Sequence, residues 1–244
     1  MISILTPTWQ RSQRCFEFIK SIYTKTDQPQ NIELLFYVDK DDPQLTHYKK
    51  LEKACHKNYP DFNNVKFIIQ PPISVSKSWN IIAAQSKGDI LIMGNDDLLY
   101  RTSHWDTILK QKIQNYYHKD EIYCAWFNDG LNGSKHCAFP ILSRKWYKTV
   151  GYFSPGVFNF GYNDTWVFDI AKKIDRLLYI PEVLVEHMHF TIGKSDNDKT
   201  YQRNRIEERG NLYELDAEIF EQTKELRVQD AEKLITVMEI WLIQ

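Results

Sequence analysis

The chain has 244 residues, of which 43% are hydrophobic and 14% aromatic, so it can bury a substantial core. Its 31 Lys and Arg residues nearly balance its 32 Asp and Glu residues, which gives no overall electrostatic reason to expect a nucleic-acid or membrane partner. The sequence has no secretory leader, no apolar run of about 18 residues and no metal-type spacing among its four cysteines. We therefore expect a folded cytoplasmic protein without a transmembrane segment.

Short apolar runs alternate with longer amphipathic segments over residues 1–100. The apolar runs predict strands at 2–6, 34–38, 65–70 and 90–93. The amphipathic segments predict helices near 11–24, 43–58 and 74–87. This repeated order of strand, helix and strand indicates right-handed crossovers and a mostly parallel sheet with helices on both faces. The first part of the chain is therefore predicted to form half of an open α/β fold.

Acidic side chains follow two of these strands. Asp39 comes directly after the run LLFYV, and Asn95, Asp96 and Asp97 follow ILIMG. Open parallel sheets bind ligands beyond the carboxyl ends of their strands, so we expect both clusters at one crevice. Their oxygens suit Mg²⁺ or Mn²⁺, which complete their shells with water and substrate phosphates. The alternative is that Asn95 and Asp96 form a turn or cap a helix near Ser103, with Asp97 exposed.

The usual phosphate-binding loops are missing. The sequence contains neither GxGxxG nor GxxxxGK[ST], and ILTPTWQR at the first strand contains no glycine. Backbone amides alone therefore cannot cradle a diphosphate there. A divalent cation would have to neutralise it, which favours the metal interpretation of the acidic residues.

Over roughly residues 1–200 the chain resembles the GT-A nucleotide-sugar glycosyltransferases, and among them the family-2-like enzymes. The likeness runs in order through ISILTPTWQR, FYVDKDDP, SVSKSWNIIAAQSKGDILIMGNDDL and GYNDTWVFDIAKK. It implies a GT-A (Rossmann-like) α/β fold with a mixed, mostly parallel sheet flanked by helices. It also implies that Asp39 contacts the nucleobase and that Asn95, Asp96 and Asp97 replace the family's DxD motif, with Asp97 on the metal. Asn95 departs from that motif because it carries no charge.

The resemblance also implies further contacts to a nucleoside-diphosphate sugar. The residues assigned to the donor, besides those of the acidic motif, are Thr6, Pro7, Arg11, Asn80 and Lys194. Lys194 belongs to a polar loop that, with Arg203 or Arg205, is expected either to close over the diphosphate or to be an ordinary solvated connection.

The second half is expected to hold the acceptor. In CAFPILSRKWYKTVGYFSPG a short apolar strand precedes a helix that starts at a serine and is closed by Gly151. The resemblance places this segment at the acceptor pocket, where Phe139, Trp146 and Phe153 would either stack on the acceptor or pack in the core.

Asp164 opens the next amphipathic helix, in the segment FGYNDTWVFDIAKK. A carboxylate at this place can cap the helix, or it can take the proton from an acceptor hydroxyl. The resemblance implies the catalytic role for Asp164, because the family has its catalytic carboxylate at the start of the matching helix. Asp169 lies farther inside the helix and is expected to be structural.

His187 and His189 end a strand-like run and are separated by one residue, so both would share one face of an extended segment. A single buried histidine in such a place usually packs in the core. The resemblance implies instead that one of the two is a metal ligand, with the other hydrogen-bonding around the site. The sequence does not choose between them.

From about Arg205 onward, mixed charges and regularly spaced apolar residues predict one or two amphipathic helices, packed on the rest of the chain or on a second copy. We therefore expect a catalytic domain at 1–204, with a donor half at 1–100 and an acceptor half at 101–204, and a helical extension at 205–244. The expected activity is metal-dependent, inverting transfer of a sugar to a hydroxyl of a glycan or another acceptor, modified nucleic acid included. The alternatives are a nucleotidyltransferase of similar fold and a non-catalytic binding protein on a degenerate scaffold.

Overall fold

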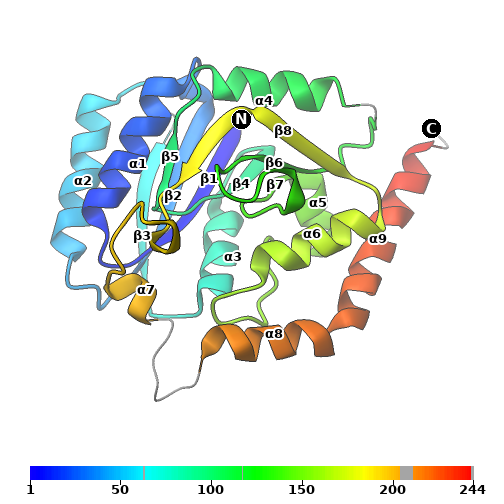
Figure 1. Ribbon diagram of the computed structural model, residues 1–244. Coiled ribbons are helices and arrows are strands. Elements are labelled where there is room, and N and C mark those ends of the chain that lie inside the picture. Colours follow the sequence, from blue (N-terminus) through cyan, green and yellow to red (C-terminus); the bar gives the residue numbers. More distant parts are fainter. Residues whose placement is uncertain (63, 117, 204–210, 243–244) are drawn as a thin grey trace.

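The computed structural model describes residues 1–62, 64–116, 118–203 and 211–242, with side chains to residue 240 (Figure 1). The predicted boundary between residues 204 and 205 lies outside the described residues, and so does Arg205.

The strands in this described part form one mixed sheet of eight strands in the order β3-β2-β1-β4-β7-β6-β8-β5. They are β1 (Ile2–Thr8), β2 (Ile32–Asp39), β3 (Asn64–Gln70), β4 (Ile90–Met93), β5 (Leu98–Tyr100), β6 (Cys124–Asn128), β7 (Ile141–Ser143) and β8 (Leu177–His187). Strands β1 to β4 pair in parallel and β7 runs antiparallel to both of its neighbours, while β8 is parallel to β6 and antiparallel to β5. The four strands predicted for the first part of the chain and the mixed sheet are confirmed.

Both faces of the sheet are covered, because its central strands are apolar along nearly their whole length. On β2, Leu34 and Phe36 join one hydrophobic cluster, whereas Leu35 and Tyr37 join the other. This alternation follows from the pleat, which turns successive side chains to opposite faces. Continuous apolar runs of this kind are typical of parallel strands that helices cover on both sides.

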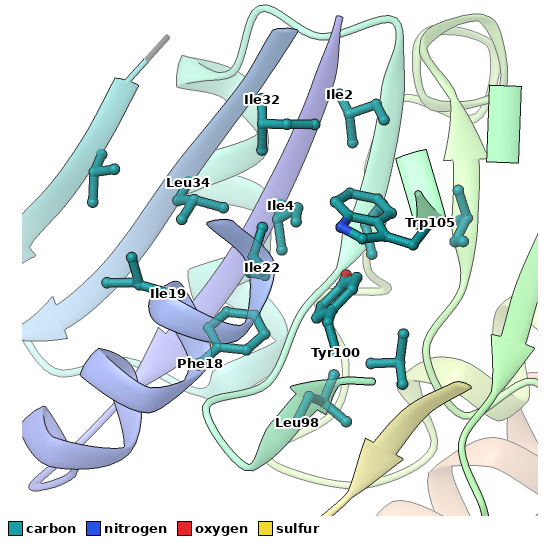
Figure 2. Packing of buried hydrophobic residues seen from close by; sticks show 14 of the residues in the cluster. Ile2, Ile4, Phe18, Ile19, Ile22, Ile32, Leu34, Leu98, Tyr100 and Trp105 are labelled. Carbon is teal, nitrogen blue, oxygen red and sulfur yellow. The ribbon is translucent and has the colours of Figure 1, made fainter. Parts of the chain in front are cut away.

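The helices form a layer on each face (Figure 1). They are α1 (Ser12–Lys25), α2 (Leu45–Asn58), α3 (Val75–Gln85), α4 (Trp105–Gln114), α5 (Arg144–Val150), α6 (Asn163–Lys173), α7 (Lys199–Arg203), α8 (Leu212–Gln222) and α9 (Lys224–Leu242). Helices α1, α2 and α4 pack on one cluster, and α3, α5, α6 and α9 pack on the other. Figure 2 shows the first cluster, in which Phe18 and Ile22 of α1 face Ile4 of β1. Short 3-10 helices occur at Pro29–Asn31, Gly133–Lys135 and Phe190–Ile192.

The C-terminal helices pack on the rest of the chain, which was one of the two predicted arrangements. Ala231 and Leu234 of α9 are buried in the second cluster. The Nε of Arg227 donates to Oδ2 of Asp169 on α6 at 2.7 Å, so Asp169 has the structural role that was expected. No helix in the described ranges is both long and apolar enough to cross a membrane.

Candidate active site

The carboxyl ends of β1, β2 and β4 meet at one edge of the sheet, because the three strands pair in parallel. Asp39 ends β2, and Asn95, Asp96 and Asp97 follow β4, so the sheet brings both predicted acidic clusters to this edge. The alternative in which Asp97 is exposed is wrong, because that residue is only 3% exposed. Asn95 accepts the backbone N–H of Asp96 at 3.1 Å and so shapes the acidic turn.

Glycine precedes this turn for a steric reason. A Cβ added to Gly94 would lie 2.3 Å from Oγ1 of Thr6, which itself is fully buried and has no hydrogen-bond partner among the described residues. Thr6 thus lies directly beneath the acidic turn. Pro7 follows it on β1 and is half-buried. The sequence predicted donor contacts for both residues, and the structure places both near the carboxyl end of β1.

A buried arginine explains how two adjacent carboxylates can be tolerated. Nη1 of Arg11 donates to Oδ1 of Asp96 at 2.8 Å, and its Nε and Nη2 donate to the two carboxylate oxygens of Asp198 at 2.8 and 2.9 Å. Oγ1 of Thr8 donates to the other oxygen of Asp96 at 2.6 Å. Burial works to lower the pKa of Arg11, but Asp96, Asp198 and Asp97 raise it above its ordinary value. Arg11 therefore stays charged, and such a bidentate, charge-assisted contact is strong.

Asp97 has different partners from Asp96. Its Oδ2 accepts a hydrogen bond from the hydroxyl of Tyr201 at 2.6 Å, lies 3.4 Å from Nε2 of His187 and lies 3.9 Å from Nη1 of Arg11. Burial works to raise the pKa of Asp97, but His187, Arg11 and Tyr201 outweigh it and hold the pKa below its ordinary value. Asp97 is therefore ionised at neutral pH. For Asp96, burial and the charge of Asp97 outweigh Arg11 and Thr8, and the pKa is raised.

The residues around Asp97 fit a divalent cation. Oδ1 of Asp97 and both ring nitrogens of His187 are buried and form no hydrogen bond within the described part of the chain, although Nε2 lies 3.4 Å from Oδ2 of Asp97. A carboxylate oxygen and an imidazole nitrogen left in this way are ordinary ligands of Mn²⁺. The described residues contain no group of three or more His, Cys, Asp or Glu side chains placed to hold one ion. Asp97 and His187 would therefore supply two ligands, and water and diphosphate oxygens the rest, as is usual for hard cations.

The second predicted histidine lies beside the first. The ring centroids of His187 and His189 are 4.9 Å apart, in keeping with a shared face. Nδ1 of His189 accepts the backbone N–H of Thr191 at 3.3 Å, and its ring lies 5.0 Å from the ring of Tyr201. Nε2 of His187 approaches Oδ2 of Asp97 to 3.4 Å, which favours His187 as the candidate ligand.

Helix α7 lies over this edge (Figure 1), and its side chains contact Asp97 and Asp39. Besides the bonds of Asp198 to Arg11 and of Tyr201 to Asp97, Nη1 of Arg203 lies 2.7 Å from Oδ2 of Asp39. Burial raises the pKa of Asp39 despite this arginine. Arg203 was predicted from the sequence, but Asp198 and Tyr201 were not, since nothing in their local pattern shows that they contact Arg11 and Asp97.

Lys194 is held by a neighbouring carboxylate. Its Nζ donates to Oε1 of Glu186 at 2.6 Å, and Nε of Arg101 donates to the other oxygen of Glu186 at 2.7 Å. Lys194 also lines a cavity of about 220 Å³ next to Asp96 and Asp97. The structure therefore brings Lys194 close to the acidic motif, as is needed if its loop closes over a diphosphate.

Asn80 is occupied by a loop of the chain itself. Its Nδ2 donates to the carbonyl of Ser154 at 2.7 Å, and its Oδ1 accepts the backbone N–H groups of Phe153 and Ser154 at 2.8 and 3.0 Å. The side-chain amide of Asn80 thus fixes this loop. Phe153 and Trp146 are fully buried, so the core alternative holds for these two aromatic residues. Phe139 packs on His187, with ring centroids 5.0 Å apart.

Asp164 lies in the first turn of α6 and does not cap it. The helix begins at Asn163, and the capping position is Tyr162, which has a left-handed backbone with φ of 61°. Oδ1 of Asp164 accepts the backbone N–H of Thr165 at 2.8 Å, and its Oδ2 lies 2.8 Å from Nε2 of His136. The N-cap alternative for Asp164 is therefore wrong. The sequence analysis missed His136, which approaches only through the fold.

No family model and no curated protein matches the sequence. Solved structures do match: the mannosyltransferase PcManGT from Pyrobaculum calidifontis in complex with GDP-Man and Mn²⁺ has a TM-score of 0.58 at 13% identity, over 76% of this chain and 56% of its own. S. aureus TarS 1-349 in complex with UDP-GlcNAc has a TM-score of 0.57 at 14% identity, over 77% of this chain and 60% of its own.

GalNAc-T7 with UDP, GalNAc and Mn²⁺ has a TM-score of 0.58 at 15% identity, over 77% of this chain and 43% of its own. The chain thus spans between 43% and 60% of the length of these three proteins. At this level of identity the likeness concerns the fold. The chain has the GT-A fold of nucleotide-sugar glycosyltransferases, as the sequence predicted.

Proposed function

We propose that this protein transfers a sugar from a nucleoside-diphosphate sugar to a hydroxyl acceptor, with inversion at the anomeric carbon and with Mn²⁺ or Mg²⁺ as cofactor. The observation that carries the proposal is the pair of Asp97, which follows β4, and His187, which ends β8, because buried ligand atoms of both form no hydrogen bond among the described residues. Support also comes from the structural neighbours, which were determined with nucleotide sugars, nucleotides or Mn²⁺.

In this proposal each acidic residue has its own task. Asp39 accepts hydrogen bonds from the nucleobase, and Asp97 with His187 holds the cation, which when bound supplies positive charge to the departing diphosphate. Arg11 neutralises Asp96 and keeps the turn in place. The amine of Lys194, released from Glu186, can approach the diphosphate from the neighbouring cavity.

The acceptor side is proposed at the start of α6. Asp164 lies 2.8 Å from His136 and is partly exposed, so an acceptor hydroxyl can reach this pair. Removal of the hydroxyl proton there would let the oxygen attack the anomeric carbon in line, and a single displacement of this kind inverts the configuration. The acceptor can be a glycan or another hydroxyl-bearing molecule.

The predicted compartment remains part of the proposal. All four cysteines are free thiols, which is in keeping with the reducing cytoplasm that we expect. A homo-oligomer formed through the C-terminal helices also stays a prediction, and Tyr213 and Leu215 of α8 are exposed apolar residues that could serve it.

A donor panel tests the proposed function. Calorimetry with UDP- and GDP-sugars, with and without Mn²⁺, should show metal-dependent binding by the parent protein. Asp97→Asn should lose that binding, whereas the control Asp61→Asn, at an exposed site between α2 and β3, should keep it. Unchanged metal-dependent affinity in Asp97→Asn would contradict the proposal. Turnover should release a nucleoside diphosphate, and release of pyrophosphate from a nucleoside triphosphate would instead indicate a nucleotidyltransferase.

A further inference from the structure

The pair formed by His136 and Asp164 has the geometry of a catalytic dyad. Nε2 of His136 lies 2.8 Å from Oδ2 of Asp164, and the two side chains are 30% and 28% exposed. The other oxygen of Asp164 is taken by Thr165, through its backbone N–H at 2.8 Å and its hydroxyl at 3.4 Å. Both carboxylate oxygens are thus engaged. Nε2 is the nitrogen of His136 that is bonded in the described structure, which leaves Nδ1 as the atom of the pair for a substrate.

Neighbouring residues hold both the ring of His136 and the loop that carries it. Its ring packs edge-on against Phe168 of α6, with centroids 5.5 Å apart and an angle of 88° between the planes. The next residue, Cys137, is fully buried, with its Sγ 3.7 Å from Sγ of Cys124. Asp129 shapes the start of the same loop by accepting the backbone N–H groups of Leu131 and Asn132. A base held by its surroundings in this way needs little reorganisation before it reacts.

The loop that carries His136 is attached at both ends to neighbours of the acidic motif. At one end the carbonyl of Asp129 accepts the backbone N–H of His187 at 3.0 Å, and at the other the carbonyl of Pro140 accepts the backbone N–H of Met93 at 2.9 Å. Phe139 of the same loop packs on His187. The dyad and the Asp97–His187 pair are therefore borne by directly connected segments.

We propose that His136 is the base that takes the proton from the acceptor hydroxyl and that Asp164 orients it. In the step, the O–H bond of the acceptor breaks and the proton moves to Nδ1 of His136. The acceptor oxygen forms a bond to the anomeric carbon, and the bond from that carbon to the diphosphate breaks, with its electron pair leaving on the diphosphate. Asp164 accepts the hydrogen on Nε2 and stabilises the imidazolium, as the carboxylate does in other carboxylate–histidine pairs. This inference rests on the proposed glycosyl transfer and replaces Asp164 alone as its base.

The charged groups around His136 set the pH range of this step. Those that face it are Asp164 and Lys172 of α6 and Asp129 at the end of β6. The hydrogen bond to Asp164 raises the pKa of His136, burial and Lys172 lower it, and the net pKa lies above 6.5. A base must be neutral, so kcat/KM should rise as the pH passes upward through this pKa. A carboxylate base acting alone would give a flat profile above about pH 6, because its pKa is ordinarily about 4.

The test combines a titration with kinetics on the full chain. NMR of the histidine imidazoles in the parent, without donor, should give a pKa above 6.5 for His136, and Asp164→Asn should lower it. His136→Gln should reduce kcat about 10²–10⁴-fold, leave the Kd of the donor with Mn²⁺ within about twofold, and abolish the rise of rate with pH. His56→Gln, at an exposed position on α2, is the matched control and should change nothing.

The possible outcomes distinguish failure of the dyad proposal from failure of the proposed glycosyl transfer. A parent that transfers no sugar from any donor overturns the proposed function and the base role together. An active parent with a flat pH profile, or a His136→Gln variant within about fivefold of it, overturns the dyad alone and returns the base role to Asp164. The pH profile of kcat/KM for the parent needs no variant, so it also decides the case in which a substitution prevents folding.

Discussion

The ion pairs of Arg11 lead to a quantitative prediction for stability. Arg11→Gln removes the guanidinium that donates to Asp96 at 2.8 Å and to both oxygens of Asp198. Asp96 and Asp97 are buried, so water cannot replace the lost charge. Removal of one partner from a buried pair costs about 3–5 kcal/mol. Loss of the guanidinium contact with the ring of Tyr201, now at 4.1 Å, adds about 0.5–1 kcal/mol. We expect the free energy of unfolding to fall by about 3–5 kcal/mol at neutral pH, because relaxation offsets part of the sum.

The loss in free energy of unfolding caused by Arg11→Gln, called the deficit below, should grow as the pH rises. The pKa of Asp96 is already raised by burial, and Arg11 is the largest influence that opposes the rise. Without Arg11 the folded-state pKa of Asp96 must rise further above its unfolded value. A raised carboxyl pKa leaves stability intact below the unfolded pKa and removes it as the pH rises toward the folded pKa. The deficit of Arg11→Gln should therefore be smaller near pH 5 than near pH 7.

Urea unfolding followed by tryptophan fluorescence at both pH values measures this effect, with equal m-values as the condition for comparing midpoints. Arg14→Gln is the matched control. Nη2 of Arg14 lies 3.4 Å from Asp198 and is partly exposed, so its loss should cost less than about 1 kcal/mol. A deficit for Arg11→Gln below about 1 kcal/mol at neutral pH, or one that grows on acidification, would refute the reasoning.

Three further predictions concern core packing, the acidic turn and the ion pair of Asp39. Leu234→Ala should lower the free energy of unfolding by about 2–5 kcal/mol in urea, because the side chain is fully buried; a loss below about 1 kcal/mol would mean that α9 contributes little to the core. Gly94→Ala should cost about 1–3 kcal/mol in thermal unfolding, since its methyl group would sit 2.3 Å from a hydroxyl oxygen, and Gly156→Ala, with 3.9 Å of clearance, should be neutral. Arg203→Ala should tighten nucleoside-diphosphate binding by a few fold in calorimetry, because it frees Asp39; weaker binding would show that the arginine contacts the nucleotide.

The sequence predicted the elements whose formation depends on local pattern. Strands β1 to β4 are apolar runs of ordinary length, and the helices between them carry apolar residues at helical spacing. The sequence analysis did not predict β5 or α7, which are short. Leu98–Tyr100 becomes a strand only by pairing with β8, and Lys199–Arg203 becomes a helix where Asp198 accepts the backbone N–H groups of Thr200 and Tyr201.

The residues of the candidate site also fall into those that a local pattern indicates and those that only the fold brings together. Asp39 and Asp97 could be proposed because Asp39 ends β2 and Asp97 lies in the turn after β4, and parallel strands bring their carboxyl ends together. His187 was one of two candidates, and only the antiparallel pairing of β5 with β8, which sets Leu98 opposite His187, places it near Asp97. His136 could not be found, because 28 residues separate it from Asp164 and no periodic pattern connects the loop to the helix.

The two neighbouring carboxylates of the acidic turn differ in charge compensation, and that difference bears on which one can hold a cation. Both oxygens of Asp96 are bonded, one to Arg11 and one to Thr8, so a metal ion would have to displace a buried guanidinium to reach it. In Asp97, Oδ2 contacts both Tyr201 and His187, whereas Oδ1 has no partner in the described structure. Because Arg11 carries the charge that offsets Asp96, Asp97 remains ionised beside it, and the oxygen that has no partner in the described structure stays available. A buried arginine thus allows two adjacent carboxylates to differ, so that Asp96 has a structural role and Asp97 keeps an oxygen for the cation that we propose.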